Sequence, residues 1–203
     1  MLTNGPEQGP TLILAHGAGA AMDSDFMNLL AEGLGQAGIK VLRFEFPYMA
    51  QRRETGKKRP PDRAPKLLDS FADVLSSQGT QPIFIGGKSM GGRMATLLAT
   101  ERQVAGVCVY GYPFHPAGKA EKQRLDHLPD IGCPVLICQG ERDALGNRPE
   151  VESYDLPHNI ELHWLPDGDH SLKPRKASGL TLMDNLNSAI RQTRAFIDQH
   201  SAL

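Results

Sequence analysis

The sequence predicts an α/β fold in which a mainly parallel sheet is covered by helices on both faces. Six short apolar runs recur along the 203 residues, and helix-like segments separate them. The runs are almost continuously hydrophobic rather than alternating, as expected of strands buried on both sides. We find no internal repeat and no linker rich in Gly, Ser or Pro, so we expect a single domain over residues 1–203.

The elements follow one another at regular intervals. The expected strands are Thr11–Ala15, Val41–Phe46, Pro82–Ile85, Val104–Tyr110, Val135–Gln139 and Ile160–Leu165. Apolar residues at helical spacing mark helices at Asp23–Gln36 and Lys66–Ser76. A third helix, Ser89–Thr100, continues from a glycine-rich turn, and an apolar stripe from Leu182 to Ile197 marks the last. Each helix has one apolar face to pack on the sheet.

Residues 47–65 depart from this pattern and are expected to form a long, ordered, basic loop. They hold six basic residues against Glu54 and Asp62, and Pro60, Pro61 and Pro65 stiffen the backbone. A fixed positive loop would steer anions, and guanidinium groups pair well with carboxylate or phosphate. Arg52, Arg53 and Arg59 are therefore candidate substrate-binding residues; the alternative, which the composition favours, is a solvated basic loop.

The composition gives no charge-based partner. Hydrophobic residues make up 40% and the formal net charge is −1, so general attraction to nucleic acid or to a membrane is not expected. Three cysteines, two of them in strand runs, do not make a disulfide framework. No leader-like start and no apolar run of ~18 residues is present. We expect a cytoplasmic protein, either a monomer or a small homo-oligomer.

The strongest local motif is G-x-S-x-G, formed by Gly87, Ser89 and Gly91 between an apolar strand and an amphipathic helix. The sharp strand-to-helix turn exposes the serine, and the small residues around it let neighbouring backbone pass. The pattern predicts Ser89 as a nucleophile. The Met90 N–H at the helix start is expected to donate a hydrogen bond to the negatively charged substrate oxygen. The second donor is expected to be the Ala18 N–H, in the glycine-bearing turn after the first strand.

A serine nucleophile needs a base and an acid that orients the base. In a parallel sheet both should follow later strands, at the carboxyl ends. Asp143 follows the fifth expected strand and His170 the sixth. Glu141 competes with Asp143 because it lies nearer the strand end, and Asp143 could instead cap the next helix. His170 could also be a solvated loop histidine.

Two other site chemistries are weighed against this one. Asp167, Asp169 and His170 cluster as metal ligands would, but Cys and His pairs at zinc spacing are absent from the sequence. Cys108, Cys133 and Cys138 are interpreted as small core residues rather than nucleophiles. We therefore expect neither a metal nor another cofactor.

These motifs resemble those of the compact α/β-hydrolases grouped near the dienelactone hydrolases. The resemblance is greatest to a bacterial branch related to the animal testis-expressed and chromatin-complex homologues of that fold. It rests on Phe46–Met49, Lys58–Arg63, Gly86–Arg93, Gln139–Asp143 and Gly168–Arg175. It implies a minimal α/β-hydrolase fold with about six mostly parallel strands and no large lid domain. It also implies a Ser89, Asp143 and His170 triad with an oxyanion hole from the Ala18 and Met90 amides.

Two functions are expected from different classes. The first is hydrolysis of a small-molecule carboxylic ester or thioester through an acyl-serine intermediate. The basic loop allows for an anionic substrate. The dienelactone hydrolases proper use a cysteine where this chain has Ser89, so their reaction is not carried over. The second is a non-catalytic binding or adaptor module on the same scaffold. Three dispersed residues of complementary chemistry favour the enzyme.

Overall fold

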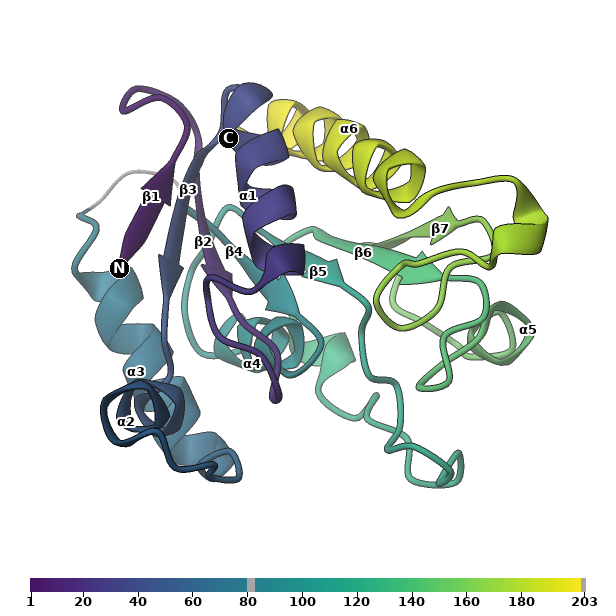
Figure 1. Cartoon of the computed structure of the whole chain (residues 1–203), viewed down its shortest axis with the longest axis horizontal. Coiled ribbons are helices and arrows are strands. Elements are labelled where there is room, and N and C mark those ends of the chain that lie inside the picture. The colour runs from purple at the N-terminus through teal and green to yellow at the C-terminus, as the bar shows by residue number, and fades with distance from the viewer. Residues whose placement is uncertain (80–82, 202–203) are drawn as a thin grey trace.

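A computed structural model describes residues 1–79 and 83–201 of the chain, which form a seven-stranded sheet covered by helices (Figure 1). The strand order is β1-β3-β2-β4-β5-β6-β7, and every neighbouring pair is parallel except β1 with β3. The strands are β1 Leu2–Asn4, β2 Thr11–Ala15, β3 Lys40–Phe44, β4 Ile83–Lys88, β5 Gly106–Tyr110, β6 Val135–Gly140 and β7 Ile160–Leu165. The loops after β2, β4, β6 and β7 therefore share one edge of the sheet.

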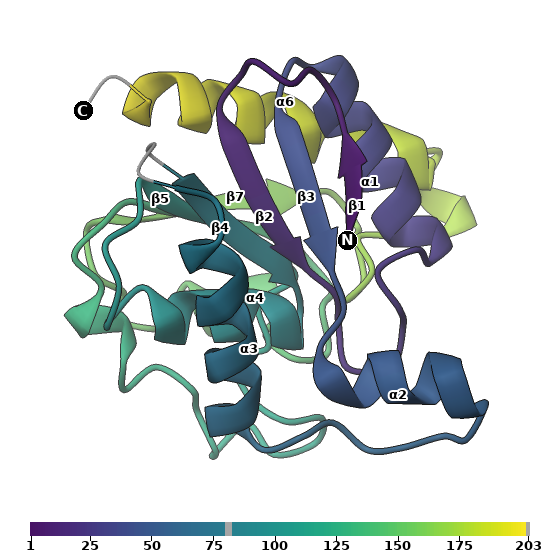
Figure 2. The ribbon, with the colours of Figure 1, turned by 90° about the vertical axis from the view of Figure 1, so that its left-hand side faces the viewer.

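Helices lie on both faces of this sheet. On one face pack α1 and α6, and on the other α3 and α4 (Figure 1). Their bounds are α1 Asp25–Gln36, α3 Ala64–Ser76, α4 Met90–Leu98 and α6 Leu182–His200. Helix α2, Pro47–Thr55, lies beyond the carboxyl ends of β2 and β3 (Figure 2), and α5, Arg148–Val151, is a single turn.

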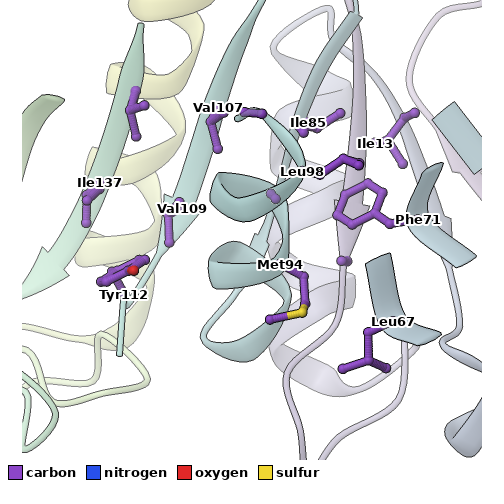
Figure 3. Close-up of a cluster of buried hydrophobic side chains, with 14 of the residues drawn as sticks. Ile13, Leu67, Phe71, Ile85, Met94, Leu98, Val107, Val109, Tyr112 and Ile137 are labelled. Atoms are coloured by element: carbon purple, nitrogen blue, oxygen red, sulfur yellow. The ribbon is translucent and has the colours of Figure 1, made fainter. Parts of the chain in front are cut away.

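The sheet separates two hydrophobic clusters, because successive side chains of a strand point to opposite faces. In β2, Ile13 joins the α3 and α4 side, whereas Leu12 and Leu14 join the α1 and α6 side. Figure 3 shows the first cluster, where Phe71 of α3 and Met94 of α4 pack over the central strands. Burial on both faces explains why the strands are continuously apolar in the sequence, and it fixes the strand ends that carry the site.

The expected fold class is confirmed, and two elements differ from the expectation. Strand β1 was not expected: it has three residues, is largely exposed and pairs antiparallel at the sheet edge. The expected loop over residues 47–65 is wrong in its first half, which is helix α2. Pro47 occupies the first turn, where its missing N–H costs nothing, and Gly56 ends the helix with a φ of 68°. The expected start of a strand at Pro82 lies outside the described residues.

The described residues contain no helical insert after β5, where a lid would stand; a 3₁₀ turn, Leu128–Asp130, is the one helical element before β6. Among residues 1–79 and 83–201, no helix has both the length and the apolar character needed to cross a membrane.

Candidate active site

The turn between β4 and α4 places Ser89 in an unusual backbone conformation. Its φ is 52° and its ψ is −115°, a region that residues with side chains rarely adopt. The turn needs glycine on both sides. A Cβ on Gly87 would lie 2.5 Å from the Ala15 carbonyl oxygen, and one on Gly91 would lie 2.6 Å from the same atom. The close passage of β2 therefore explains both glycines of the motif and leaves the serine hydroxyl at the sheet edge.

His170 lies in the loop after β7, and its imidazole faces Ser89. The imidazole Nε2 is 2.7 Å from the serine Oγ. The loop is brought onto the end of β6 by tight backbone packing, since a Cβ on Gly140 would lie 2.5 Å from the carbonyl oxygen of Gly168. Asp167, at the start of the loop, has a φ of 51°. This strained turn holds a residue 81 positions from Ser89 within hydrogen-bond distance of it.

Asp143, fully buried in the turn after β6, lies on the other side of the imidazole. Its Oδ2 accepts hydrogen bonds from His170 Nδ1 at 2.8 Å and from Gln139 Nε2 at 3.0 Å, and its Oδ1 accepts one from the Leu145 N–H at 2.8 Å. A carboxylate that faces three donors is the acceptor, so Nδ1 of His170 carries the ring proton. Nε2 is then left to accept the serine hydroxyl proton.

Glu141, the alternative acid in the sequence, points away from the imidazole. Its carboxylate accepts hydrogen bonds from Arg148 Nη1 at 2.9 Å and from the Asp167 N–H at 2.9 Å. It therefore ties the β6 and β7 loops together.

Gln139 was missed by the sequence reasoning. Its amide is fully buried and, besides Asp143, contacts the Tyr112 N–H at 2.7 Å and the Gly146 carbonyl at 3.0 Å. It thereby fixes the carboxylate relative to the loops after β5 and β6. The available signal was a lone amide side chain at the end of an apolar strand, because a buried amide must find hydrogen-bond partners.

The turn after β2 carries the second expected oxyanion donor. His16 accepts the Phe46 N–H through Nε2 at 3.1 Å, so its Nδ1 donates to the Gly17 carbonyl at 2.7 Å. Burial lowers the pKa of His16, which is consistent with this neutral form. Tyr48, which sequence reasoning also missed, donates to the Ala18 carbonyl at 2.9 Å. These contacts fix the orientation of the Ala18 peptide.

The two expected donor N–H groups are unpaired. Met90 is the first residue of α4 and has no carbonyl one helical turn before it. In residues 1–79 and 83–201 no acceptor bonds to the N–H of Met90 or of Ala18. Gly17 packs beside the elbow, since a Cβ on it would lie 3.8 Å from the Cβ of Ser89. The Ala18 turn is therefore adjacent to the serine.

Lys88, whose direction the sequence left open, points inward. Its ammonium donates to the His170 main-chain carbonyl at 2.6 Å and lies 5.6 Å from the centre of the Phe26 ring. Burial lowers the pKa of Lys88 to about 8, against the opposing effect of the Asp143 and Asp169 charges. The residue before the nucleophile is thus bound to the loop that carries the imidazole.

The three candidate arginines of residues 47–65 differ in their surroundings. Arg53 pairs with Asp23 at 2.8 Å and with Glu45, and these carboxylates raise its pKa. Arg59 donates to the Gln51 side chain. Arg52 lies on a cavity of about 310 Å³ next to the Ala18 turn, whose other lining residues include Gly19, Ala21 and Met49. Among residues 1–79 and 83–201, no hydrogen bond joins any of these three arginines to Ser89.

The clustered carboxylates beside His170 are engaged by the protein itself. Asp167 pairs with Arg175 and Arg142, and the Arg175 contacts lower its pKa to about 2. Asp169 accepts the N–H groups of Ser171 and Lys173 at 2.8 and 3.0 Å. Within the described ranges, no group of three His, Cys, Asp or Glu side chains could hold a metal ion.

The cysteines lie away from the site. Cys108 and Cys138 are buried in the cluster under α1 and α6, where burial raises the pKa of each thiol. Cys133 is half-buried, and burial raises its pKa to about 11.

The chain is similar to several solved structures. Est1E from Butyrivibrio proteoclasticus has a TM-score of 0.73 and 16% identity, covering 98% of this chain and 90% of that one. XC6422 from Xanthomonas campestris, described as a serine hydrolase without lid, has a TM-score of 0.67 and 21% identity, covering 96% and 87%. Dienelactone hydrolase from Anabaena variabilis has a TM-score of 0.69 and 19% identity, covering 97% and 89%.

These likenesses concern the fold. A family model described as an alpha/beta hydrolase domain matches residues 8–198, which is nearly the whole chain. The chain therefore belongs to the alpha/beta hydrolase domain family.

Proposed function

We propose that this chain is a serine hydrolase that cleaves a carboxylic ester or thioester through an acyl-serine intermediate. One observation carries the proposal: Ser89 Oγ, both nitrogens of His170 and Asp143 Oδ2 form a continuous chain of hydrogen bonds of 2.7 and 2.8 Å. This arrangement lets a weak nucleophile lose its proton as it attacks. Membership of a hydrolase family supports the same class of reaction.

The first half of the reaction acylates the serine. Ser89 Oγ attacks the carbonyl carbon while its proton passes to Nε2 of His170, and Asp143 stabilises the imidazolium that results. The Ala18 and Met90 N–H groups receive the negative charge on the carbonyl oxygen. When the tetrahedral intermediate collapses, the bond to the leaving oxygen or sulfur breaks and His170 returns its proton to that atom.

Deacylation repeats these steps with water. His170 takes a proton from a water molecule as the water oxygen attacks the acyl carbon, and then returns it to Ser89 Oγ as the ester bond breaks. The products are a carboxylic acid and an alcohol or thiol. The likeness to Est1E, whose structure with ferulic acid bound has a TM-score of 0.74 at 15% identity, is compatible with an ester substrate.

Labelling with a fluorophosphonate probe tests the nucleophile. The wild type is expected to react and Ser89→Ala is not, whereas the matched control Ser171→Ala, at an exposed serine next to the base, should react like the wild type. Absence of labelling in the folded wild type would overturn the proposal and favour the adaptor function.

A substrate panel then separates the two leaving groups. p-Nitrophenyl esters and acyl thioesters of graded acyl length should be hydrolysed by the wild type and by Ser171→Ala. Loss of hydrolysis in Ser89→Ala but not in His170→Ala would show that His170 is not the base.

A further inference from the structure

We propose that Arg93 and Arg124 form an oxyanion-binding subsite next to Ser89, and that the substrate therefore carries a carboxylate or phosphate group a few bonds from the scissile carbonyl. This inference rests on the proposed hydrolase function and narrows its substrate class. It rests on four features: the position of Arg93 on α4, its unpartnered Nε, the placement of Arg124, and the absence of a paired carboxylate.

Arg93 lies one helical turn after the nucleophile. Its main-chain N–H donates to the Ser89 carbonyl at 3.0 Å, so the two residues share one face of α4. Four residues of helix span about 6 Å, and helical side chains lean toward the amino-terminal end. The Arg93 side chain therefore begins one helical turn from the serine, and its charge acts on Tyr112, Arg124 and His127.

The Arg93 guanidinium is not fully satisfied. Its Nε is buried and makes no hydrogen bond within residues 1–79 and 83–201. A buried donor without a partner is costly, and guanidinium groups bind planar oxyanions through two adjacent N–H groups. The Nε–H and a neighbouring Nη–H of Arg93 are such a pair, and an anion would supply the missing acceptor.

Arg124 is held near Arg93 by the main chain after β5. Its N–H donates to the Phe114 carbonyl at 2.8 Å, and its carbonyl accepts the hydroxyl of the fully buried Tyr112 at 2.8 Å. Burial, and secondly the Arg93 charge, lowers the pKa of Arg124. The two guanidinium groups are therefore close enough to repel one another.

No carboxylate neutralises this pair. Over the described residues, the ion pairs involve neither Arg93 nor Arg124. His127 lies nearby, and its Nε2 is hydrogen-bonded to Thr96 Oγ1 at 2.9 Å. Burial and the Arg93 charge together lower the pKa of His127 to about 4. Arg53, by contrast, is already bound to two carboxylates. Among the described residues Arg52, at the cavity beside the Ala18 turn, also makes no ion pair, but Arg93 and Arg124 are two unpaired cations whose charges act on each other.

The test compares two esters that differ only in charge at the far end. We would measure kcat/KM for the p-nitrophenyl half-ester of adipic acid and for p-nitrophenyl hexanoate, in which a methyl group replaces the free carboxylate. The wild type should prefer the half-ester. In Arg93→Gln and in Arg124→Gln this preference should fall by about 10- to 100-fold with hexanoate hydrolysis retained, because a charge-assisted hydrogen bond is lost. Arg93→Lys should restore part of it, and Arg102→Gln, at an exposed arginine, should not change it.

Binding is measured separately from turnover. Free adipate and inorganic phosphate, each as an inhibitor of hexanoate hydrolysis and as a stabiliser in thermal unfolding, tell a carboxylate site from a phosphate site. Arg93→Gln should abolish both effects of the anion that binds. Equal losses on both esters, no half-ester preference in the wild type, or an anion effect unchanged in Arg93→Gln would overturn the subsite. If the folded wild type neither hydrolyses any ester or thioester of the panel nor reacts with the fluorophosphonate, the proposed function fails, and the thermal shift still decides whether the arginines bind an anion.

Discussion

The ammonium of Lys88 donates a hydrogen bond of 2.6 Å to the main-chain carbonyl of His170. The residue that precedes the nucleophile in β4 thus holds the loop of the proposed base. Gly111 completes the contact, since a Cβ there would lie 2.8 Å from the same carbonyl oxygen and 3.1 Å from the ammonium. The distance between serine and imidazole therefore depends on a buried cation.

Replacing Lys88 by Met is expected to flatten the alkaline pH dependence of stability. The pKa of Lys88 is lowered to about 8 in the folded protein from 10.5. Below about pH 8 the lysine is charged in the folded and in the unfolded protein, so burial of the charge lowers the free energy of unfolding by its full amount. Above that pH the unfolded state binds more protons, so this group makes the free energy of unfolding rise with pH until about 10.5. The contribution that Lys88→Met removes is at most about 3 kcal/mol.

Urea unfolding between about pH 7 and pH 10 measures this slope for the wild type and the variant. Lys119→Met, at an exposed lysine, should keep the wild-type slope. An unchanged slope in Lys88→Met would show that the buried ammonium does not titrate in this range.

Replacing Asp143 by Asn should lower kcat by roughly 10³- to 10⁴-fold in a protein that still folds. The amide can donate to Nδ1 of His170, which moves the ring proton to Nε2 and removes the acceptor for the serine hydroxyl. Steady-state kinetics on an ester that the wild type hydrolyses gives the size of the loss. Glu141→Gln, at the neighbouring acid that bonds to Arg148, is the matched control and should keep most of the activity. The reverse order of effects would make Glu141 the orienting acid.

Replacing Gln139 by Leu should destabilise the fold by about 2–6 kcal/mol and also reduce kcat. The change leaves the Tyr112 N–H and the Gly146 carbonyl buried without partners, and each costs about 1–3 kcal/mol. It also removes a donor to Asp143, so the carboxylate is less well held. Denaturant unfolding and kinetics measure the two effects. The control is Gln192→Leu, at an amide of α6 that makes a solvent-exposed hydrogen bond to Glu161 of β7. It should lower the free energy of unfolding by about 0.5 kcal/mol or less.

Replacing Gly91 by Ala should cost about 1–3 kcal/mol and abolish most of the reaction with a fluorophosphonate. The new methyl group would lie 2.6 Å from the carbonyl oxygens of Ala15 and His16, and these belong to main chain that cannot rotate away. The turn must open, which displaces both Ser89 and the Ala18 peptide. Gly132→Ala, where nothing lies within 4 Å of the new Cβ, should be neutral in both measurements. A reactive, stable Gly91→Ala protein would show that the elbow tolerates a wider turn.

Periodicity and apolar runs were enough to predict the parallel strands and the main helices, because burial on both faces leaves a continuous signal. Strand β1 gave no such signal: Leu2–Asn4 is held by backbone pairing with β3 and not by burial of its side chains. Helix α2 was not predicted because most of its residues are polar or charged and only Tyr48 and Met49 form a buried apolar face. Proline there marked a helix start rather than a loop.

The positions of Ser89, Asp143 and His170 could be predicted from motif and chain order, since each follows a strand that ends at the same sheet edge. Their catalytic roles, and the placement in the branch related to the testis-expressed and chromatin-complex homologues, stay predictions. The pairing of Arg53 and the inward direction of Lys88 could not be predicted. Both depend on segments distant in the sequence: Asp23 in one case and the His170 loop in the other.

The 81 residues that separate Ser89 from His170 also set an order of events during translation. At about 5–20 residues per second, a ribosome exposes the serine roughly 4–16 s before the histidine. A nascent chain in that interval holds the serine without the imidazole that lies 2.7 Å from it in the folded protein, so the proposed nucleophile meets its proposed base only after β7 has joined the sheet.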